Sequence, residues 1–454
     1  MVSEFFQLKE KKTNLKIEIV AGITTFLTMA YIIFVNPSIL SLEGIPEQKL
    51  TGIERMDKDA LIAVTCIVTA ITTIIVGLVA RAPIAMAPGM GLNAFFAYHL
   101  VASGKMDWQT ALGVVFISGL LFLAVTLSGL RKKIVEAIPP SLVSAIAVGI
   151  GLFITFIGLK NLGVVIHDPK TLVAAGPLTI TVLIGLVGML VMIVFEMKKI
   201  AGGLVVGILV STILAVLFDK QVEIPQQCIS LHLNIQKIAF RLNILSALKW
   251  SFLGTIFTLT FMDMFDSVGT LIACCHQANM VDKEGKIKDL NRLLGIDAVA
   301  TVIGALLGTS TITAYIESAA GIEQGGRSGL TSIVTGLLFL IALLFIPIVA
   351  IVPLYATAPA LIMVGLFMMK EIKKVDFANL EQAFPAFIIM VMIALSYSIS
   401  KGLAFGFISF ALIKTVSGKV REVKPAMWII AILSILFLTL DRLPDIIIWL
   451  KNLT

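Results

Sequence analysis

Long apolar runs separated by short polar connections make up most of the chain. The runs lie at about 18–40, 60–80, 84–101, 108–129, 141–159, 178–196, 200–218, 251–273, 293–308, 310–325, 328–349, 351–369, 381–399 and 402–416. Many approach the roughly 20 residues that a membrane-spanning helix needs, and others are shorter. The pattern predicts an all-α polytopic membrane protein with about 14 transmembrane segments. A further run at 426–440 fits either a short span or a surface helix.

Composition agrees with this class. Hydrophobic residues make up 58% of the chain, charged residues only 14%, and the mean hydropathy is +1.02, far above that of soluble domains. The first run is too long for a signal peptide, and no small-residue cleavage site follows it before the polar stretch at 43–59. We therefore expect it to be a retained span.

The positive charges predict the orientation. If the segments cross alternately from a cytoplasmic N-terminus, roughly two-thirds of the Lys and Arg residues fall in inner loops. We therefore expect a multi-pass protein of the cell membrane with its N-terminus in the cytoplasm. Because the position of these cations explains the net charge of +7, nucleic acid is not an expected partner. The cysteines lack metal-ligand spacing, and we expect no metal and no cofactor.

The two halves of the chain echo one another. "AGITTFLTMAY" (21–31) resembles "LGTIFTLTFMD" (253–263), "AIAVGIGLF" (145–153) resembles "ALIMVGLF" (360–367), and "IAGGLVVGI" (200–208) resembles "ISKGLAFGF" (399–407). Each pair is seven segments apart, an odd number, so the second half enters the membrane with opposite polarity. This order predicts two inverted seven-segment repeats.

Two segments at equivalent positions of the halves contain residues that interrupt helices. They read "APGMGLNAFFAY" (87–98) and "GTSTITAYIESAAG" (308–321). Pro88 suits the first position of a helix, Gly89 allows close approach of another backbone, and Thr311 and Thr313 are candidate helix caps. We expect two broken helices whose N-termini meet near the midplane and present unpaired N–H groups to a ligand. Two kinked structural helices are the alternative.

Three carboxylates lie at membrane depth. Asp263 and Asp266 are three residues apart on one helical face, and Glu317 lies on the second half-helix. Each costs at least about 2.5–3.5 kcal/mol in a bilayer, so the cluster indicates a polar cavity. Burial favours protonated carboxyls near neutral pH, which suits proton coupling. For Asp263 the alternative is to orient a neighbour or cap a backbone.

Asn93 lies one turn after Gly89 and has an amide that can both donate to and accept from a ligand. Such a residue also commonly joins membrane helices to one another, and both roles stay open. The glycine-containing stretches are not phosphate-binding loops, because no Walker lysine or soluble strand–helix unit accompanies them. The sequence therefore predicts no internal ATPase.

Three of these motifs, "APGMGLNAFFAY", "MDMFDSVGTL" and "TAYIESAAGIEQGGRSGLTS", resemble the adenine–guanine–hypoxanthine permease branch of the nucleobase:cation symporter type 2 (nucleobase–ascorbate transporter) family. The resemblance covers about residues 5–420. It implies inverted seven-span repeats, with short strands leading into half-helices in the third and tenth spans. It also implies a core domain (1–130 and 251–350), a gate domain (131–250 and 351–420) that mediates homodimerisation, and a C-terminal tail (421–454).

The resemblance further implies a secondary active transporter that imports purine nucleobases by proton symport, with sodium coupling less favoured. Glu317 is then expected to hydrogen-bond the purine ring nitrogens, and one of the two aspartates to serve in proton coupling or ligand contact. Which purine is preferred, and which aspartate is the principal one, stay open. The candidate substrate-binding residues are Glu317, Asp266, Asp263, Asn93, Gly89, Ala314 and Thr313.

Two other functions fit these residues less well on chemical grounds. An anion transporter or exchanger of the same architecture calls for a cationic binding site, whereas these segments carry carboxylates and no Lys or Arg. An intramembrane aspartyl protease needs its two aspartates on facing helices, whereas Asp263 and Asp266 share one helix. The sequence therefore favours a transporter over an enzyme.

Overall fold

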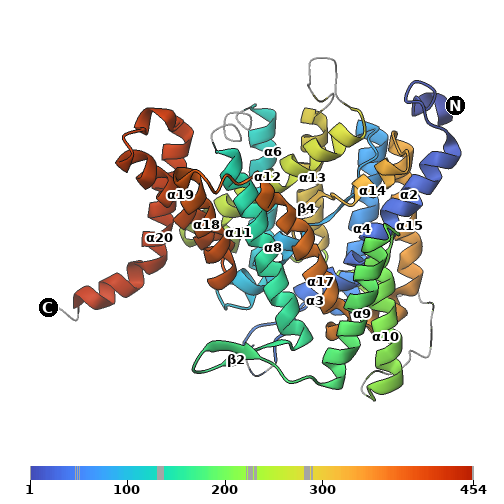
Figure 1. Ribbon diagram of the computed structural model, residues 1–454, viewed down its shortest axis with the longest axis horizontal. Coiled ribbons are helices and arrows are strands. Elements are labelled where there is room, and N and C mark those ends of the chain that lie inside the picture. Colours follow the sequence, from blue (N-terminus) through green and yellow to red (C-terminus); the bar gives the residue numbers. More distant parts are fainter. Residues whose placement is uncertain are drawn as a thin grey trace. The chain divides into compact units, whose positions relative to one another are not determined.

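The computed structural model describes residues 2–46, 48, 50, 52–129, 138–220, 222, 227, 229, 233–280, 287 and 290–451 (Figure 1). The first half contains α1 (Val2–Phe5), α2 (Leu15–Met29), α3 (Ile32–Leu40), α4 (Lys58–Ile75), η2 (Val76–Ala80), β1 (Met86–Pro88), α5 (Met90–Ala94), η3 (Phe95–Val101), α6 (Trp108–Leu127), α8 (Pro140–Leu162), β2 (Val165–Asp168), β3 (Leu172–Ala175), α9 (Ile180–Met197), α10 (Gly203–Phe218), η4 (Ile235–Lys237), α11 (Ile244–Ala247) and η5 (Trp250–Phe252).

The second half begins with the long helix that carries the predicted aspartates. It contains α12 (Leu253–Gln277), α13 (Leu290–Leu307), β4 (Ile312–Ala314), α14 (Ser318–Glu323), α15 (Gly329–Ala342), η6 (Leu343–Phe345), α16 (Ile346–Ala350), α17 (Leu354–Met368), η7 (Met369–Lys374), α18 (Leu380–Leu395), α19 (Ile399–Val416), η8 (Val420–Glu422) and α20 (Pro425–Lys451).

The predicted membrane segments are confirmed in order and type. Within the described residues, 10 helices are long and apolar enough to cross a membrane. Shorter apolar helices lie at Met90–Val101, Gly203–Phe218, Leu380–Leu395 and Pro425–Leu436. The last belongs to α20, which continues to Lys451 as one helix. Whether α20 crosses the membrane stays open.

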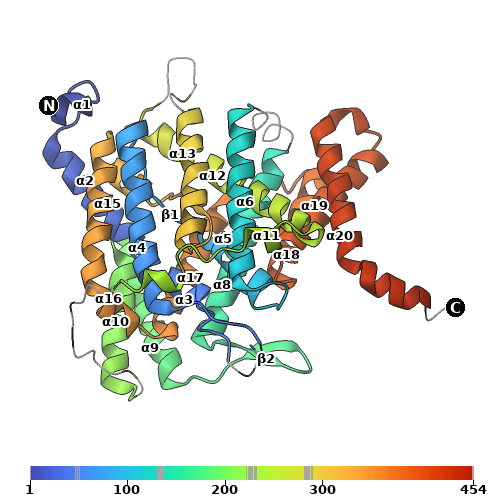
Figure 2. The ribbon, with the colours of Figure 1, turned by 180° about the vertical axis from the view of Figure 1, so that it is seen from behind.

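The helices group into two compact units, one of Met1–Leu127 with Phe156–Met363 and the other of Ser128–Thr155 with Val364–Thr454. In the first unit α15 packs against both α2 and α4, and the three lie side by side (Figures 1 and 2). Glycines allow this close packing, since a Cβ added to Gly77 lies only 2.5 Å from the Gly329 carbonyl oxygen.

The second unit is built around the antiparallel neighbours α18 and α19. Here Gly402 and Gly406 of α19 receive the side chains of Ile393 and Ile389, whose atoms lie 2.3 and 2.0 Å from an added Cβ. Small residues at this interface let the backbones approach, as is usual where no hydrophobic effect drives helices together in lipid.

A pair of very short strands lies in the first unit, where the sequence predicts interrupted helices. β1 and β4 pair antiparallel, with Met86 opposite Ala314, Ala87 opposite Thr313 and Pro88 opposite Ile312. All six residues are buried, and β1 and β4 lie among the helices (Figures 1 and 2). Non-helical backbone at this depth needs partners from the protein, and each strand supplies them to the other. The predicted strands and half-helices of the third and tenth segments are therefore confirmed.

Candidate functional site

The first interrupted segment turns from strand to helix at Gly89. This residue has extended backbone (φ −70°, ψ 116°), and its N–H donates to the Thr311 carbonyl at 3.0 Å. A Cβ at this position lies 3.1 Å from Cγ2 of Thr313, so only glycine leaves Thr313 its full space. The helix continues through α5 into the wider π-helical turns of η3. Gly89 and Thr313, both predicted site residues, thus lie next to each other.

The second interrupted segment is tied to the first on both sides of β4. The Tyr315 N–H donates to the Ala85 carbonyl at 2.9 Å, and the Ala85 N–H donates to the Ser318 hydroxyl at 3.0 Å. The Tyr315 hydroxyl donates to the Pro88 carbonyl at 2.6 Å. These bonds fix where α14 begins, and Glu317 is the residue immediately before it.

Glu317 is half-buried and is held by Tyr31, a residue outside the predicted site. The Tyr31 hydroxyl donates to Oε1 of Glu317 at 2.7 Å, and Tyr31 itself is 1% exposed. Tyr31 lies at the break between α2 and α3, so the first membrane segment is also interrupted at the level of the site. One carboxylate oxygen of Glu317 is thereby occupied by the protein.

The two aspartates of α12 have different neighbours. Asp266 interacts with the Thr313 hydroxyl and lies near enough to Glu317 and Tyr315 to act on them electrostatically. Asp263 is 1% exposed, and its Oδ2 accepts a hydrogen bond from the Thr301 hydroxyl at 2.9 Å. Asp266 therefore shares a cluster with Glu317, whereas Asp263 bonds to the next helix, α13.

Thr301 explains what the Asp263 contact does. Its hydroxyl lies 3.1 Å from the Ile312 carbonyl oxygen and 3.2 Å from the Ile312 nitrogen, at the start of β4. Asp263 thus supports the strand that carries Thr313 and Ala314. This is the alternative role considered for it, which is to orient a neighbour and satisfy a backbone.

Asn93 is fully buried, with both ends of its amide bonded to the protein. Its Nδ2 donates to Oδ1 of Asn36 at 2.6 Å, and its Oδ1 accepts from the Ser310 hydroxyl. The structure therefore joins Asn93 to α3 and to the segment before β4, as in the alternative of a contact between helices. Ala314 lies in β4 opposite Met86, also buried.

Sequence reasoning missed Tyr31 and Asn36, although each carried a weak signal. Both are polar side chains in an apolar run, and Asn36 immediately precedes Pro37. Their hydrogen bonds reach residues up to 286 positions away along the chain, a separation that no local pattern encodes.

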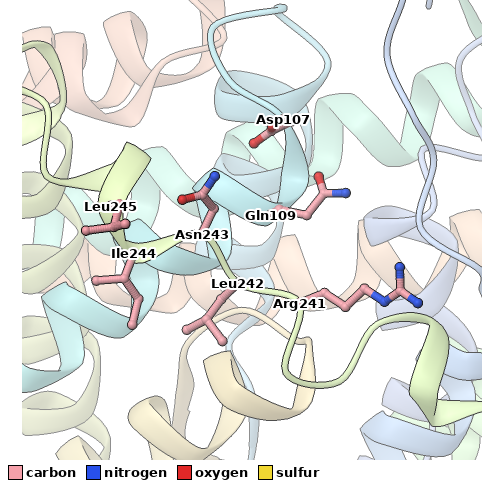
Figure 3. Close-up of a pocket in the computed structure, with 7 residues that line it drawn as sticks. All are labelled: Asp107, Gln109, Arg241, Leu242, Asn243, Ile244 and Leu245. Carbon is pink, nitrogen blue, oxygen red and sulfur yellow. The ribbon is translucent and has the colours of Figure 1, made fainter.

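A surface hollow lies apart from this cluster of residues. It is lined by Asp107 and Gln109 at the start of α6 and by residues 241–245, and it contains none of the predicted site residues (Figure 3). Among the described residues, no group of three His, Cys, Asp or Glu side chains could hold a metal ion. The candidate site is therefore the cluster around β1 and β4.

The electrostatics of this cluster suit neutral or cationic guests. The described groups that act on Glu317 are the Tyr31 hydroxyl, a backbone amide and the Asp266 carboxyl, and Asp266 interacts with the Thr313 hydroxyl, so these neighbours are neutral or acidic. A carboxylate in such surroundings is an acceptor for N–H groups or a carrier of a proton.

Comparison with known proteins agrees with this architecture. The Permease family matches residues 16–405. The guanine/hypoxanthine permease PbuG of Bacillus subtilis is 41% identical over 439 residues, which cover 95% of this chain and 98% of PbuG. The adenine permease AdeP of Escherichia coli is 38% identical over 442 residues, which cover 96% of this chain and 95% of AdeP.

A solved structure shares the fold at low sequence identity. The transmembrane domain of a cyanobacterium bicarbonate transporter BicA matches with a TM-score of 0.63 and 15% identity, covering 84% of this chain and 96% of that domain. This likeness concerns the fold alone, and it supports the predicted inverted seven-segment repeats. Family and fold agree along most of the chain: it belongs to the permease family, in the branch of the guanine/hypoxanthine and adenine permeases, and is a multi-pass membrane transporter and not an enzyme.

Proposed function

We propose that this permease imports purine nucleobases, namely hypoxanthine, guanine and adenine, across the cell membrane together with a proton. Relatives named as guanine/hypoxanthine and adenine permeases align with almost the whole chain. The observation that carries the proposal is the β1–β4 pair, which gathers a glutamate, an aspartate and two helix starts into one cluster.

Glu317 is the proposed principal purine ligand. With Oε1 engaged by Tyr31, its other oxygen accepts from a ring N–H group when ionised, and the carboxyl donates to a ring nitrogen when protonated. A purine that lacks one of these hydrogen bonds loses affinity, because binding then leaves a polar group without a partner. Gly89, Thr313, Ala314 and Asn93 complete the proposed binding surface with backbone and side-chain groups.

Asp266 is the proposed proton-coupling group, with Asp263 and Glu317 as the other carboxyls that could take part. Asp266 lies in the same cluster as Glu317, so its protonation changes the field felt by the ligand-binding carboxylate. Asp263 is engaged with Thr301 and β4. Sodium is the alternative coupling ion, since carboxylates bind it as well.

The proposal includes an orientation and a movement. The N-terminus lies in the cytoplasm, in keeping with the excess of Lys and Arg in the loops on that side. The core domain (1–130 and 251–350) moves against the gate domain (131–250 and 351–420) to expose the site alternately, and the protein forms a homodimer through the gate. The movement and the dimer rest on the family resemblance.

Replacement of Glu317 tests the proposed function. We expect Glu317→Ala to abolish uptake of labelled hypoxanthine into cells lacking their own purine permeases. Glu323→Ala is the matched control, because Glu323 lies on the same short helix α14 with its side chain exposed. Both variants are compared at equal levels in the membrane. Normal uptake by Glu317→Ala at wild-type membrane levels contradicts the assigned site.

Competition by a panel of purines, at several pH values with and without sodium, then defines the substrate and the coupling ion. Inhibition by hypoxanthine, guanine or adenine but not by pyrimidines is expected. Uptake that rises as the external pH falls supports the proton. Uptake that depends on sodium and not on pH supports the alternative ion.

A further inference from the structure

A chain of buried hydrogen bonds runs from the backbone of α4 to Asn93 in α5. The Thr65 hydroxyl donates to the Leu61 carbonyl at 2.6 Å and accepts from Nδ2 of Asn36 at 2.7 Å. Oδ1 of Asn36 accepts from Nδ2 of Asn93 at 2.6 Å, and Oδ1 of Asn93 accepts from the Ser310 hydroxyl. The four linked side chains, Thr65, Asn36, Asn93 and Ser310, are at most 1% exposed.

The direction of this chain is determined at its α4 end. A backbone carbonyl can only accept, so the single hydroxyl hydrogen of Thr65 is directed to Leu61. The Thr65 oxygen must then accept, and Asn36 must present its NH2 group to it. The Asn36 oxygen consequently faces Asn93, which must donate. A flip of either amide places two acceptors or two donors face to face in a buried site, which is costly.

The same bonds tie together the two interrupted segments. Asn93 belongs to α5, whereas Ser310 lies two residues before β4. Asn36 also lies 3.4 Å from the Thr309 hydroxyl, in the same segment before β4. The orientation of the Asn93 amide is therefore set by α3, α4 and the segment before β4 together, and not by α5 alone.

We propose that Asn36 and Thr65 are positioning residues that lock the Asn93 amide in one orientation and thereby determine how the permease discriminates 6-oxo from 6-amino purines. This inference rests on the proposed function. A 6-oxo purine presents an acceptor oxygen and an adjacent N–H donor, whereas a 6-amino purine presents an N–H donor and an acceptor nitrogen. Beyond its bonds to Asn36 and Ser310, the Asn93 amide keeps one N–H hydrogen and one oxygen lone pair for a ligand. A freely turning amide serves both patterns with these groups, whereas a locked one favours one of them.

Thr65→Val tests the lock, because it removes the hydroxyl at nearly constant volume. Thr72→Val is the matched control. Thr72 is equally buried, lies about two turns further along the same face of α4, and bonds only within its own helix, at 2.8 Å to the Val68 carbonyl. The readout is the ratio of the inhibition constants of adenine and hypoxanthine against labelled hypoxanthine uptake.

We expect Thr65→Val to change this ratio by roughly fivefold, the equivalent of one net hydrogen bond, and Thr72→Val to leave it within about twofold of wild type. An unchanged ratio in a transporting Thr65→Val variant overturns the inference. A similar change in both variants also overturns it, because general packing of α4 is then the cause.

A second variant decides the matter if Thr65→Val does not reach the membrane. Ser310→Ala removes the donor at the other end of the chain and is judged by the same ratio against the same control. The proposed function fails separately. If wild-type protein takes up no purine, that proposal is rejected before any variant is compared, whereas uptake with unchanged ratios rejects only the amide lock.

Discussion

A hydrogen bond from Tyr31 makes the two carboxylate oxygens of Glu317 unequal. Oε1 accepts from the tyrosine hydroxyl at 2.7 Å. A charge-assisted bond of this kind is stronger than one between neutral groups, and it restricts rotation of the carboxylate. Tyr31 is therefore a positioning residue in the proposed mechanism, because its bond to Oε1 leaves Oε2 as the oxygen that can serve a ligand.

Tyr31→Phe is expected to raise the KM for hypoxanthine about 5- to 20-fold, with a smaller change in maximal rate. A hydrogen bond to a charged group contributes roughly 1.5–3 kcal/mol, and we expect only part of this to be lost from substrate binding. The measurement is initial uptake as a function of substrate concentration. Tyr355→Phe is the control, because the Tyr355 hydroxyl bonds the carboxylate of Asp219, outside the candidate site. An unaltered KM in Tyr31→Phe removes the tyrosine from the mechanism.

A second carboxylate shows how a single residue sets a pH dependence. Asp57 caps α4 by accepting from the Ala60 N–H at 2.9 Å, and it pairs with Lys237 at 2.5 Å. Partial burial opposes ionisation, but the bonds from Lys237 and Ala60 outweigh it and hold the pKa of Asp57 below its usual range. Its contribution to stability is therefore complete above the unfolded pKa of about 4 and is lost as pH falls through the folded pKa.

Asp57→Asn is expected to keep the cap and lose the ion pair, at a small cost in stability because the Lys237 end of the pair is solvent-exposed and water screens it. The apparent melting temperature in detergent should fall slightly at pH 7, and the difference from wild type should disappear once the pH lies below the folded-state pKa of Asp57. Asp57→Ala, which also loses the cap, should melt lower than Asp57→Asn at pH 7. Equal melting of all three proteins at pH 7 contradicts this account.

At the scale of elements, helix α2 is bonded to the start of α15 by a fully buried glutamate. Glu18 accepts from the backbone N–H groups of Arg327, Ser328 and Thr331 at 2.9–3.3 Å, and from the Thr331 hydroxyl at 2.6 Å. A carboxylate at the N-terminus of a helix satisfies donors that lack partners and interacts favourably with the helix dipole. Near the two ends of α2, Glu18 thus bonds the start of α15 and Tyr31 bonds Glu317, the residue before α14.

Glu18→Ala is expected to lower stability by about 3 kcal/mol, because it leaves several buried N–H groups without their acceptor. Glu18→Gln, which retains one acceptor oxygen, should lie between Ala and wild type. The measurement is the thermal unfolding of purified protein in detergent, monitored as the fraction of protein that stays monodisperse after heating. Glu10→Ala, which removes an exposed carboxylate from the same end of the chain, is the control. If Glu18→Ala melts at the wild-type temperature, the bonds from Glu18 to the start of α15 do not stabilise the protein as described.

Elements were predictable where a local pattern encodes them. Apolar runs specify spans, and Pro88, Gly89 and the threonines before Ala314 indicate the two interruptions. The inverted order of the halves then places β1 against β4. The partners of individual side chains were not predictable. Asp263 and Asp266 look alike in sequence, yet Asp263 bonds Thr301 and Asp266 lies near Glu317. This difference depends on where α13 packs against α12, which no local pattern encodes.

For the whole molecule, inversion of the two halves brings their interrupted segments together. Antiparallel β1 and β4 bring one interrupted segment from each half into direct contact through backbone bonds. Asp263 reaches this pair through Thr301, and Asp266 reaches it through Thr313. Because α12, β1 and β4 belong to the same compact unit, we expect a change of charge on α12 to act on the proposed binding site through these contacts.

The proposed coupling of purine transport to the proton gradient depends on this whole arrangement of α12, β1 and β4. Asp266→Asn tests the coupling. Asparagine has nearly the same shape as aspartate but carries no titratable proton. In proteoliposomes, we expect the variant to exchange labelled for unlabelled hypoxanthine and to lose accumulation driven by a pH gradient. Exchange needs only binding and movement, whereas accumulation also needs the proton to be carried.

Asp263→Asn, one turn earlier on α12, is the matched variant and is expected to lower both activities together, because its partner Thr301 supports β4. If accumulation survives in Asp266→Asn and is lost selectively in Asp263→Asn, the proton belongs to Asp263. If both variants accumulate normally, neither aspartate couples transport to the proton.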